Sequence, residues 1–266
     1  MTVEDHSAGE DNNDGLPTYR SPEEVAMWEL AEALSSLTLL GDDLYLRMQA
    51  NNVAMVDKFI MDVEADALRQ LIEAERTPMN AMFLSAQTQM WIFAVYEIFR
   101  TWRENAKDAV KLHAHGGLPL KIQSLRKHSD FRHFGREIRA KQLERVLKDA
   151  SIISRIEEDL RLTHILFFSL EHLRISFAKH QVRGKPKSIA YAPGYGRIDD
   201  QCGSLNYELS DNAVIWGTIS RRQIADLIRG LSNRANIPTP EAIKAFDENM
   251  KRLSTNLGQP PFGKTL

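Results

Sequence analysis

The feature that most constrains the fold is an uninterrupted helical pattern that follows Thr77-Pro78 and extends to about residue 111. Proline is favoured in the first turn of a helix, so this dipeptide predicts where the helix begins. Its middle, MWIFAVYEIF, is apolar on nearly every side, which is typical of a buried central helix. Glu97 is the lone carboxylate there, and we expect it to face a cleft, to reach a core arginine or to lie at the helix edge.

Helical spacing of apolar residues recurs through most of the chain. A helix start is predicted at Ser21-Pro22-Glu23-Glu24, where a hydroxyl, a proline and a glutamate occupy their favoured positions. Further helices are expected over residues 42–75, 134–149 and 151–181, after Ser220 and after Thr239-Pro240. Within the first of these, one apolar face is formed by Val56, Ile60, Val63, Ala67 and Leu71. The segment 112–120 is expected to be a loop because it contains two glycines and a proline.

A different spacing appears in the C-terminal third. Leu205, Tyr207 and Leu209 alternate with polar neighbours, and a polar turn separates them from the β-like run 213–219. This alternation predicts a small β-hairpin near residues 204–219. The fold class that we expect is therefore mainly α, a multi-helix bundle with a small β-hairpin.

Length and composition bound the domain organisation and the location. The chain has 266 residues, of which 43% are hydrophobic and 26% charged, enough for a substantial core. We expect a disordered lead at 1–20, a single helical domain at 21–256 and a tail at 257–266. Cys202 is the single cysteine, the acidic start does not resemble a signal peptide, and the longest apolar run is about half a membrane span. These features predict a cytoplasmic protein with no membrane contact.

Charge is unevenly distributed along the chain. Residues 1–50 contain eleven acids against Arg20 and Arg47, a balance of −9. Residues 121–148 contain nine lysines and arginines against three acids, a balance of +6. Such asymmetry either marks a surface that binds polyanions or reflects helix surfaces that offset each other within the fold.

Most familiar catalytic signatures are missing from the sequence. It contains no phosphate-binding GxxxxGK[ST] or GxGxxG loop, no HExxH, no pair of CxxC motifs and no GxSxG. His113 and His115, with His128 or His133, are the one combination that could bind a metal, but no carboxylate completes the set at a fixed spacing. We therefore expect neither a metal nor a cofactor.

One motif does carry chemistry. The stretch EHLRISFAKH places Arg174 and His180 near the end of a long amphipathic helix, with five residues between them. This arrangement resembles the R-x(4–6)-H motif of HEPN-domain proteins. The resemblance implies a helical domain that dimerises so that two motifs face one cleft. It also implies a metal-independent ribonuclease of a bacterial defence or toxin–antitoxin system, with an antitoxin-type protein partner.

The resemblance assigns catalysis to Arg174 and His180, and their chemistry suits RNA cleavage. A histidine near its ordinary pKa of about 6.5 can transfer a proton at neutral pH. An arginine can hold a phosphate and stabilise its developing charge. The two side chains point about 120° apart on an ideal helix, so they converge only if the helix unwinds or a second subunit completes the site. Further substrate contacts are expected from Glu171, Ser176, Lys179, Tyr195 and Arg197.

Two other functions remain open at this stage. The first is a non-catalytic helical dimer that binds a protein partner or a nucleotide, which would depend on an exposed apolar helix face. The second is a nucleic-acid binder that uses the basic stretch and would depend on Arg132, Arg136 and Arg139. The ribonuclease hypothesis would use the same stretch to guide an RNA backbone.

Overall fold

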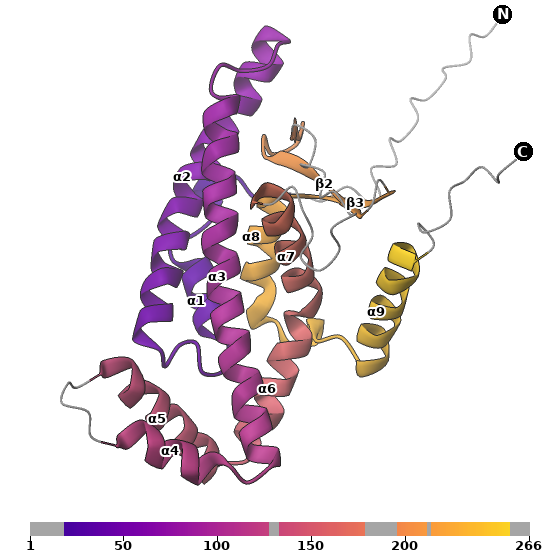
Figure 1. Cartoon of the computed structure of the whole chain (residues 1–266). Coiled ribbons are helices and arrows are strands. Elements are labelled where there is room, and N and C mark those ends of the chain that lie inside the picture. Colours follow the sequence, from indigo (N-terminus) through magenta and orange to yellow (C-terminus); the bar gives the residue numbers. More distant parts are fainter. Residues whose placement is uncertain (1–18, 128–132, 179–195, 212–213, 256–266) are drawn as a thin grey trace, which may run out of the picture.

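The computed structural model describes residues 19–127, 133–178, 196–211 and 214–255, and it confirms a mainly α chain with a small sheet in its C-terminal third (Figure 1). In chain order the elements are η1 (Pro22–Glu24), α1 (Glu29–Ser35), α2 (Leu44–Ala74), α3 (Ala81–Ala114), α4 (Leu118–Arg126), α5 (Phe134–Lys148), α6 (Ser151–Leu162), α7 (His164–Ala178), β1 (Arg197–Ile198), β2 (Leu205–Asp211), β3 (Val214–Ser220), α8 (Arg221–Arg229), η2 (Gly230–Ser232), η3 (Arg234–Asn236) and α9 (Pro240–Thr255).

Helix α3 runs through the centre of the molecule, as its apolar sequence predicts (Figure 1). Trp91, Phe99 and Trp102 are fully buried along it, and the helix packs against α2, α5, α6 and α7. The indole nitrogen of Trp91 donates to the carbonyl of Val53 at 2.9 Å, and that of Trp102 donates to the carbonyl of Thr38 at 2.8 Å. Both large side chains can therefore be buried without leaving a polar group unpaired.

The N-terminal helix begins later than the sequence predicts. The capping box at Ser21 is present, and the Ser21 amide donates to Glu24 at 2.6 Å, but it begins only the short 3-10 turn η1. Val25 then adopts an extended backbone and buries its side chain. Helix α1 starts only at Glu29, because the extended backbone at Val25 interrupts the helical conformation.

The loop predicted at 112–120 is mostly helical. Helix α3 continues to Ala114, and α4 begins at Leu118 with Pro119 in its first turn. A proline in the first turn supports a helix, since its missing N–H would have no helical partner there. Only the segment around Gly116, whose φ is +66°, has the conformation of a turn.

The helix predicted over 151–181 is divided at Thr163 into α6 and α7. The buried hydroxyl of Thr163 donates to the carbonyl of Asp159 at 2.8 Å and accepts from Arg103 at 2.5 Å. A threonine that bonds back to its own helix commonly bends it. We attribute the break to this hydroxyl, which the apolar pattern does not reveal.

The predicted hairpin is confirmed. Strands β2 and β3 pair antiparallel, with Tyr207 opposite Ile219 and a bulge between Leu209 and Ser210. Leu205, Tyr207 and Leu209 are buried on one face, as their alternation predicts. The two-residue strand β1 adds to the outer edge of β2 and was not predicted.

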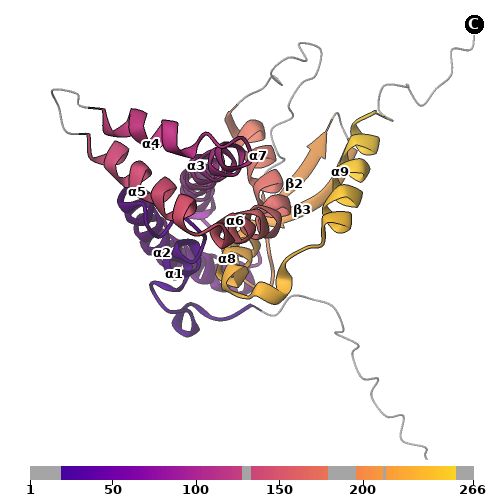
Figure 2. The ribbon, with the colours of Figure 1, turned by 90° about the horizontal axis from the view of Figure 1, so that it is seen from below.

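One cluster of buried hydrophobic residues extends from Leu30 on α1 to Leu231 on η2. Seen from below, the strands and α7 lie between α3 and the peripheral helix α9 (Figure 2). Tyr19 and Arg20, which we expected in the disordered lead, belong to the described part, and Arg20 pairs with Glu29 at 2.6 Å. None of the described helices combines the length and apolar composition that crossing a membrane requires.

Candidate functional site

Arg174 lies in a seam between α3 and α7 in which two stacked aromatic rings lie between two guanidinium groups. Its guanidinium carbon is 5.3 Å from the centre of the Tyr96 ring. Tyr96 stacks on Phe167 with ring centres 5.6 Å apart, and the guanidinium of Arg103 lies 4.8 Å from the Phe167 ring. We call these four residues the α3–α7 seam. Cations and rings attract one another in this geometry, so the seam joins the two helices.

In the part of the chain that the structure describes, the guanidinium of Arg174 is contacted on one face by an aromatic ring. Among the described residues it makes no hydrogen bond and no ion pair, and its contact is with the ring of Tyr96. A guanidinium has five N–H donors around its edge, and stacking on a ring leaves them available. Arg174 is half-buried, so these donors can reach an anion at the surface. The geometry therefore suits phosphate binding.

Arg103 is the buried cation of the seam. It is 5% exposed, and it donates to the carbonyl of Leu160 at 3.1 Å and to the hydroxyl of Thr163 at 2.5 Å. No carboxylate of the described residues pairs with it. Burial lowers the pKa of Arg103 to about 10, although the charge of Glu171 opposes this shift. Loss of water around the charge outweighs the more distant acid.

Acidic groups surround the outer part of the seam. Burial raises the pKa of Tyr96, and the charge of Glu171 raises it further, whereas Arg174 opposes the shift. Glu97 lies on the exposed side of α3 and pairs with Arg100 at 2.7 Å. Of the three positions expected for Glu97, the helix edge is the one observed. The seam thus has a mixed charge, and among the described residues the donors of Arg174 make no hydrogen bond.

The predicted site residues are only partly brought together. Glu171 and Arg174 lie close to the same ring, that of Tyr96. Ser176 is 6% exposed and therefore turned away from solvent, and Arg197 is exposed on β1. The remaining three residues, Lys179, His180 and Tyr195, lie outside the described residues.

The basic stretch is largely occupied by contacts within the protein. Arg136 donates to the carbonyl of Ser124 at 2.7 Å, and Arg139 donates to Asp108 at 2.9 Å. Arg145 pairs with Asp42, which links the basic stretch to the acidic N-terminal region. Two of the three arginines predicted to bind nucleic acid thus hold neighbouring helices together, and the third, Arg132, lies outside the described residues. The contacts favour the interpretation in which the two charged regions offset each other.

The histidines and the cysteine do not form a metal centre in the part of the chain that the structure describes. No group of three or more histidine, cysteine or acidic side chains comes together there. His113 lies in the last turn of α3 and His115 follows that helix, whereas His128 is outside the described residues. Burial raises the pKa of Cys202 to about 12, so its thiol is poorly suited to act as a nucleophile.

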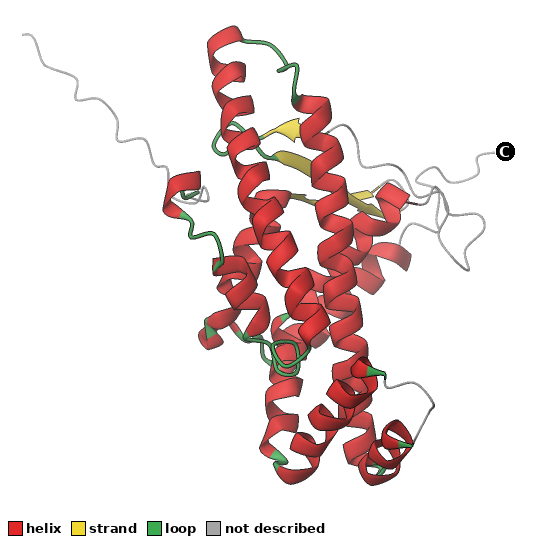
Figure 3. Ribbon diagram, turned by 90° about the vertical axis from the view of Figure 1, so that its left-hand side faces the viewer, coloured by secondary structure: helices red, strands yellow, loops and turns green. Residues whose placement is uncertain are grey.

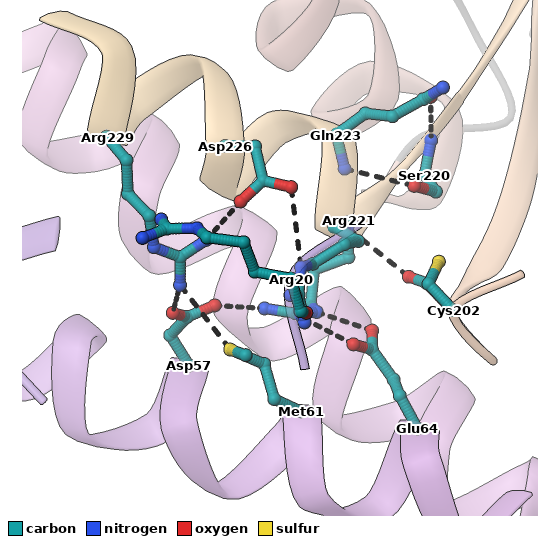
Figure 4. A network of polar contacts seen from close by, with 12 residues as sticks. Arg20, Asp57, Met61, Glu64, Cys202, Ser220, Arg221, Gln223, Asp226 and Arg229 are labelled. Carbon is teal, nitrogen blue, oxygen red and sulfur yellow. Dashed lines mark hydrogen bonds and ion pairs between the residues drawn. The ribbon is translucent and has the colours of Figure 1, made fainter. Parts of the chain in front are cut away.

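The principal polar feature that sequence reasoning missed is a buried ion network between α2 and α8 (Figure 4). Arg221 is fully buried and pairs with both Asp57 and Glu64. Arg229 pairs with Asp57 and with Asp226. Burial alone would lower the pKa of Arg221, but the Glu64 and Asp57 carboxylates more than offset it and the pKa is raised. We call these five residues the α2–α8 ion network.

The network was missed because one position of the buried face predicted for α2 was wrong. Val56 was predicted to lie on this face, but its side chain is exposed, and Asp57 is buried in its place. Asp57 and Glu64 lie two turns apart on the same side as Ile60. Carboxylates at this spacing on an apolar face are the one signal that could have revealed the network, together with an arginine partner elsewhere in the chain.

Comparisons with protein-family models, with curated proteins and with solved structures found no match for this chain. The resemblance to HEPN-domain proteins therefore depends on residues 171–180 alone.

Proposed function

We propose that this chain is a HEPN-like, metal-independent ribonuclease whose site lies at the C-terminal end of α7. Arg174 holds the phosphate that is cleaved, and His180 transfers the proton. The observation that carries the proposal is the position of Arg174, whose guanidinium face rests on Tyr96 while its donor edge is unused by the described residues. An arginine held in this way can bind phosphate oxygens without first breaking another ion pair.

The surroundings of Arg174 support this role in a second way. Tyr96 is itself stacked on Phe167, so the ring that supports the guanidinium is fixed by the packing of two helices. A catalytic group held by rigid elements keeps its position while charge develops on the phosphate. The neighbouring carboxylate of Glu171 is close enough to influence the same ring, and it can accept a hydrogen bond from a ribose hydroxyl.

The site requires that Arg174 and His180 act on one phosphate. On a continuous helix the two side chains would diverge by about 120°. A homodimer that brings the ends of two α7 helices together removes this difficulty, because the arginine of one subunit can then face the histidine of the other. We therefore include a homodimer in the proposal.

The test is cleavage of a single-stranded RNA by the full chain in the presence of a chelator. We expect Arg174→Ala and His180→Ala each to reduce the rate by about 100-fold or more, the scale of general acid–base and electrostatic contributions. Arg155→Ala, which removes an exposed arginine from α6, is the matched control and should keep full activity. Undiminished cleavage by both site variants, or no cleavage by the unaltered chain, would eliminate the proposal.

A second candidate function, a non-catalytic homodimer, is favoured by an exposed apolar face on α2 and α3. Five large side chains on these helices are between 46% and 85% exposed, namely Met55, Phe59, Met82, Phe83 and Met90. Phe59 and Phe83 contact each other edge to face with ring centres 6.4 Å apart, which joins the two helices into one surface. The side of the molecule that carries α2 faces the viewer in Figure 3. Contiguous exposed apolar groups of this kind are typical of association surfaces.

This candidate is tested by the mass of the chain in solution. The double variant Phe59→Glu/Phe83→Glu should convert a dimer to a monomer, because it places charge at the centre of the face. Asn51→Glu adds a charge at an exposed polar position of α2 and should leave the mass unchanged. A monomeric unaltered chain, or a double variant that stays dimeric, would exclude this face as the dimer interface.

A further inference from the structure

A cavity lies between α7, β3 and α9. These three elements lie near one another on one side of the molecule (Figure 2). The cavity has a volume of about 260 Å³. This is smaller than the pockets that hold drug-sized molecules, which start at about 300 Å³, so it suits a single ring system. The residues that line it are Phe168, His172, Trp216, Asp247, Met250, Lys251 and Leu253.

One wall of this cavity is aromatic. The rings of Phe168 and Trp216 are 5.7 Å apart, and His172 contacts the Trp216 ring edge to face at 5.5 Å. Behind them, Phe246 of α9 meets Phe168 at 5.3 Å with the rings perpendicular. Perpendicular contacts fix the orientation of each ring, so the wall is rigid. Flat apolar surfaces of this kind favour a planar ligand that can stack on them.

The opposite side of the cavity is formed by α9 and carries a carboxylate. Asp247 is held by His164, whose Nε2 is 2.7 Å from Asp247 Oδ1. This contact orients the carboxylate toward the body of the protein and leaves Oδ2 without a hydrogen bond among the described residues. An ionised carboxylate accepts hydrogen bonds only, so a ligand that meets Asp247 must present N–H or O–H donors there, beside the Lys251 side chain that also lines the cavity.

This cavity is separate from the α3–α7 seam. His172 and Arg174 are two positions apart on α7, which places them about 200° apart around the helix axis. A ligand here would therefore contact the side of α7 that faces away from Arg174. Binding at this cavity is therefore independent of the ribonuclease site proposed at Arg174.

We propose that this cavity binds a guanine base. A guanine offers a flat ring to Phe168 and Trp216, and two adjacent N–H donors on its Watson–Crick edge to Asp247. Adenine presents a ring acceptor beside its amino group, and uracil flanks its N–H with two carbonyls, so a carboxylate would repel part of either edge. Hypoxanthine keeps the ring N–H of guanine but lacks the amino group. The order of affinity expected from this geometry is guanine, then hypoxanthine, then adenine.

The test uses nucleosides, because they carry no phosphate to bind at Arg174. Calorimetric titration of the full chain should give guanosine an affinity about tenfold or more above inosine, the effect of one lost hydrogen bond to a charged group. Asp247→Asn should remove this preference, since its amide would meet the guanine donors with a donor or a neutral oxygen. Asp62→Asn changes an exposed aspartate on α2 and should leave the affinities as they are.

Stacking is tested separately. Trp216→Leu should weaken guanosine binding by about tenfold, the scale of one base–aromatic contact, and circular dichroism establishes whether this variant is folded. The comparison of guanosine, inosine and adenosine needs no variant, so it decides the matter even if Trp216→Leu does not fold. Three outcomes would each overturn the proposal. They are equal binding of the three nucleosides, no binding of guanosine, and tighter binding of tetramethylammonium than of guanosine.

Discussion

Arg221 and Glu64 form a buried ion pair although 157 residues separate them, with Arg221 Nε donating to Glu64 Oε1 at 2.7 Å. The pair joins the first turn of α8 to the middle of α2. Asp57 pairs with the other side of the same guanidinium, and the ring of Trp91 lies 5.3 Å from it. Three elements of the core thus meet at one cation, and the stability of their arrangement should depend on it.

Removal of the Arg221 guanidinium should strongly lower the free energy of unfolding. Arg221→Met leaves Glu64 without a partner in the core, and breaking a buried pair in this way costs about 3–5 kcal/mol of the free energy of unfolding. Urea denaturation measures the loss. Arg100→Met, which removes an exposed arginine paired with Glu97 and Glu104, is the control and should cost less than about 1 kcal/mol. Similar losses in the two variants would show that the network contributes no more than a surface pair.

Gly203 packs closely against the backbone of α2 at Glu64, which belongs to the same ion network. Its φ is +75°, and a Cβ atom built on it would lie 1.9 Å from the carbonyl oxygen of Glu64. An added methyl group must therefore displace the backbone of α2, in addition to the strain of a left-handed conformation. We expect Gly203→Ala to lower the free energy of unfolding by at least about 2 kcal/mol. Gly116→Ala separates the two effects, because Gly116 has a φ of +66° but no atom within 4 Å of such a Cβ. If the two variants lose the same free energy of unfolding, backbone strain alone explains the loss, and the close approach to Glu64 contributes nothing.

The elements of this fold that follow from local spacing were predictable. The central helix α3, the alternation of Leu205, Tyr207 and Leu209, and the capping box at Ser220 are all visible in the sequence and present in the structure. Each depends on neighbours within a few positions along the chain. The presence of these helices and of the β-hairpin could therefore be predicted without knowing which residues they pack against.

What could not be predicted depends on distant partners. The break at Thr163 involves Arg103, and the burial of Asp57 and Glu64 requires Arg221, more than 150 residues away. A charged residue on a helix is ordinarily expected on the solvent face. The α2–α8 ion network, whose carboxylates are buried, could therefore not be predicted from the sequence. The same limit applies to the candidate site, because Arg174 could be proposed from a motif but its support by Tyr96 could not.

Arg103 offers a contrast with Arg221, since it is buried and no acid of the described residues pairs with it. Burial lowers the pKa of Arg103 on folding to about 10. The folded chain therefore binds this proton less tightly than the unfolded chain, and the charge lowers stability at every pH below about 10. Methionine keeps the contact with Phe167 and removes the charge. We expect Arg103→Met to change the free energy of unfolding by less than about 1.5 kcal/mol at pH 7, against about 3–5 kcal/mol for Arg221→Met. A loss as large as that of Arg221→Met would contradict this account of the seam.

Tyr207 should give the fold a dependence on alkaline pH. It is buried on β2, and burial raises its pKa from 10.0 to about 12, although the hydroxyls of Ser85 and Thr88 oppose the shift. The unfolded chain releases this proton first, so the contribution of Tyr207 is complete below pH 10 and is lost as the pH rises toward 12. Between pH 8 and pH 11 this residue should account for a loss of about 1.4 kcal/mol. Tyr207→Phe should remove that part of the loss in urea denaturation, whereas Tyr45→Phe, at an exposed position of α2, should leave it unchanged. An identical pH dependence in the unaltered chain and in Tyr207→Phe would mean that the pKa of Tyr207 is the same in the folded and the unfolded chain, and it would contradict this prediction.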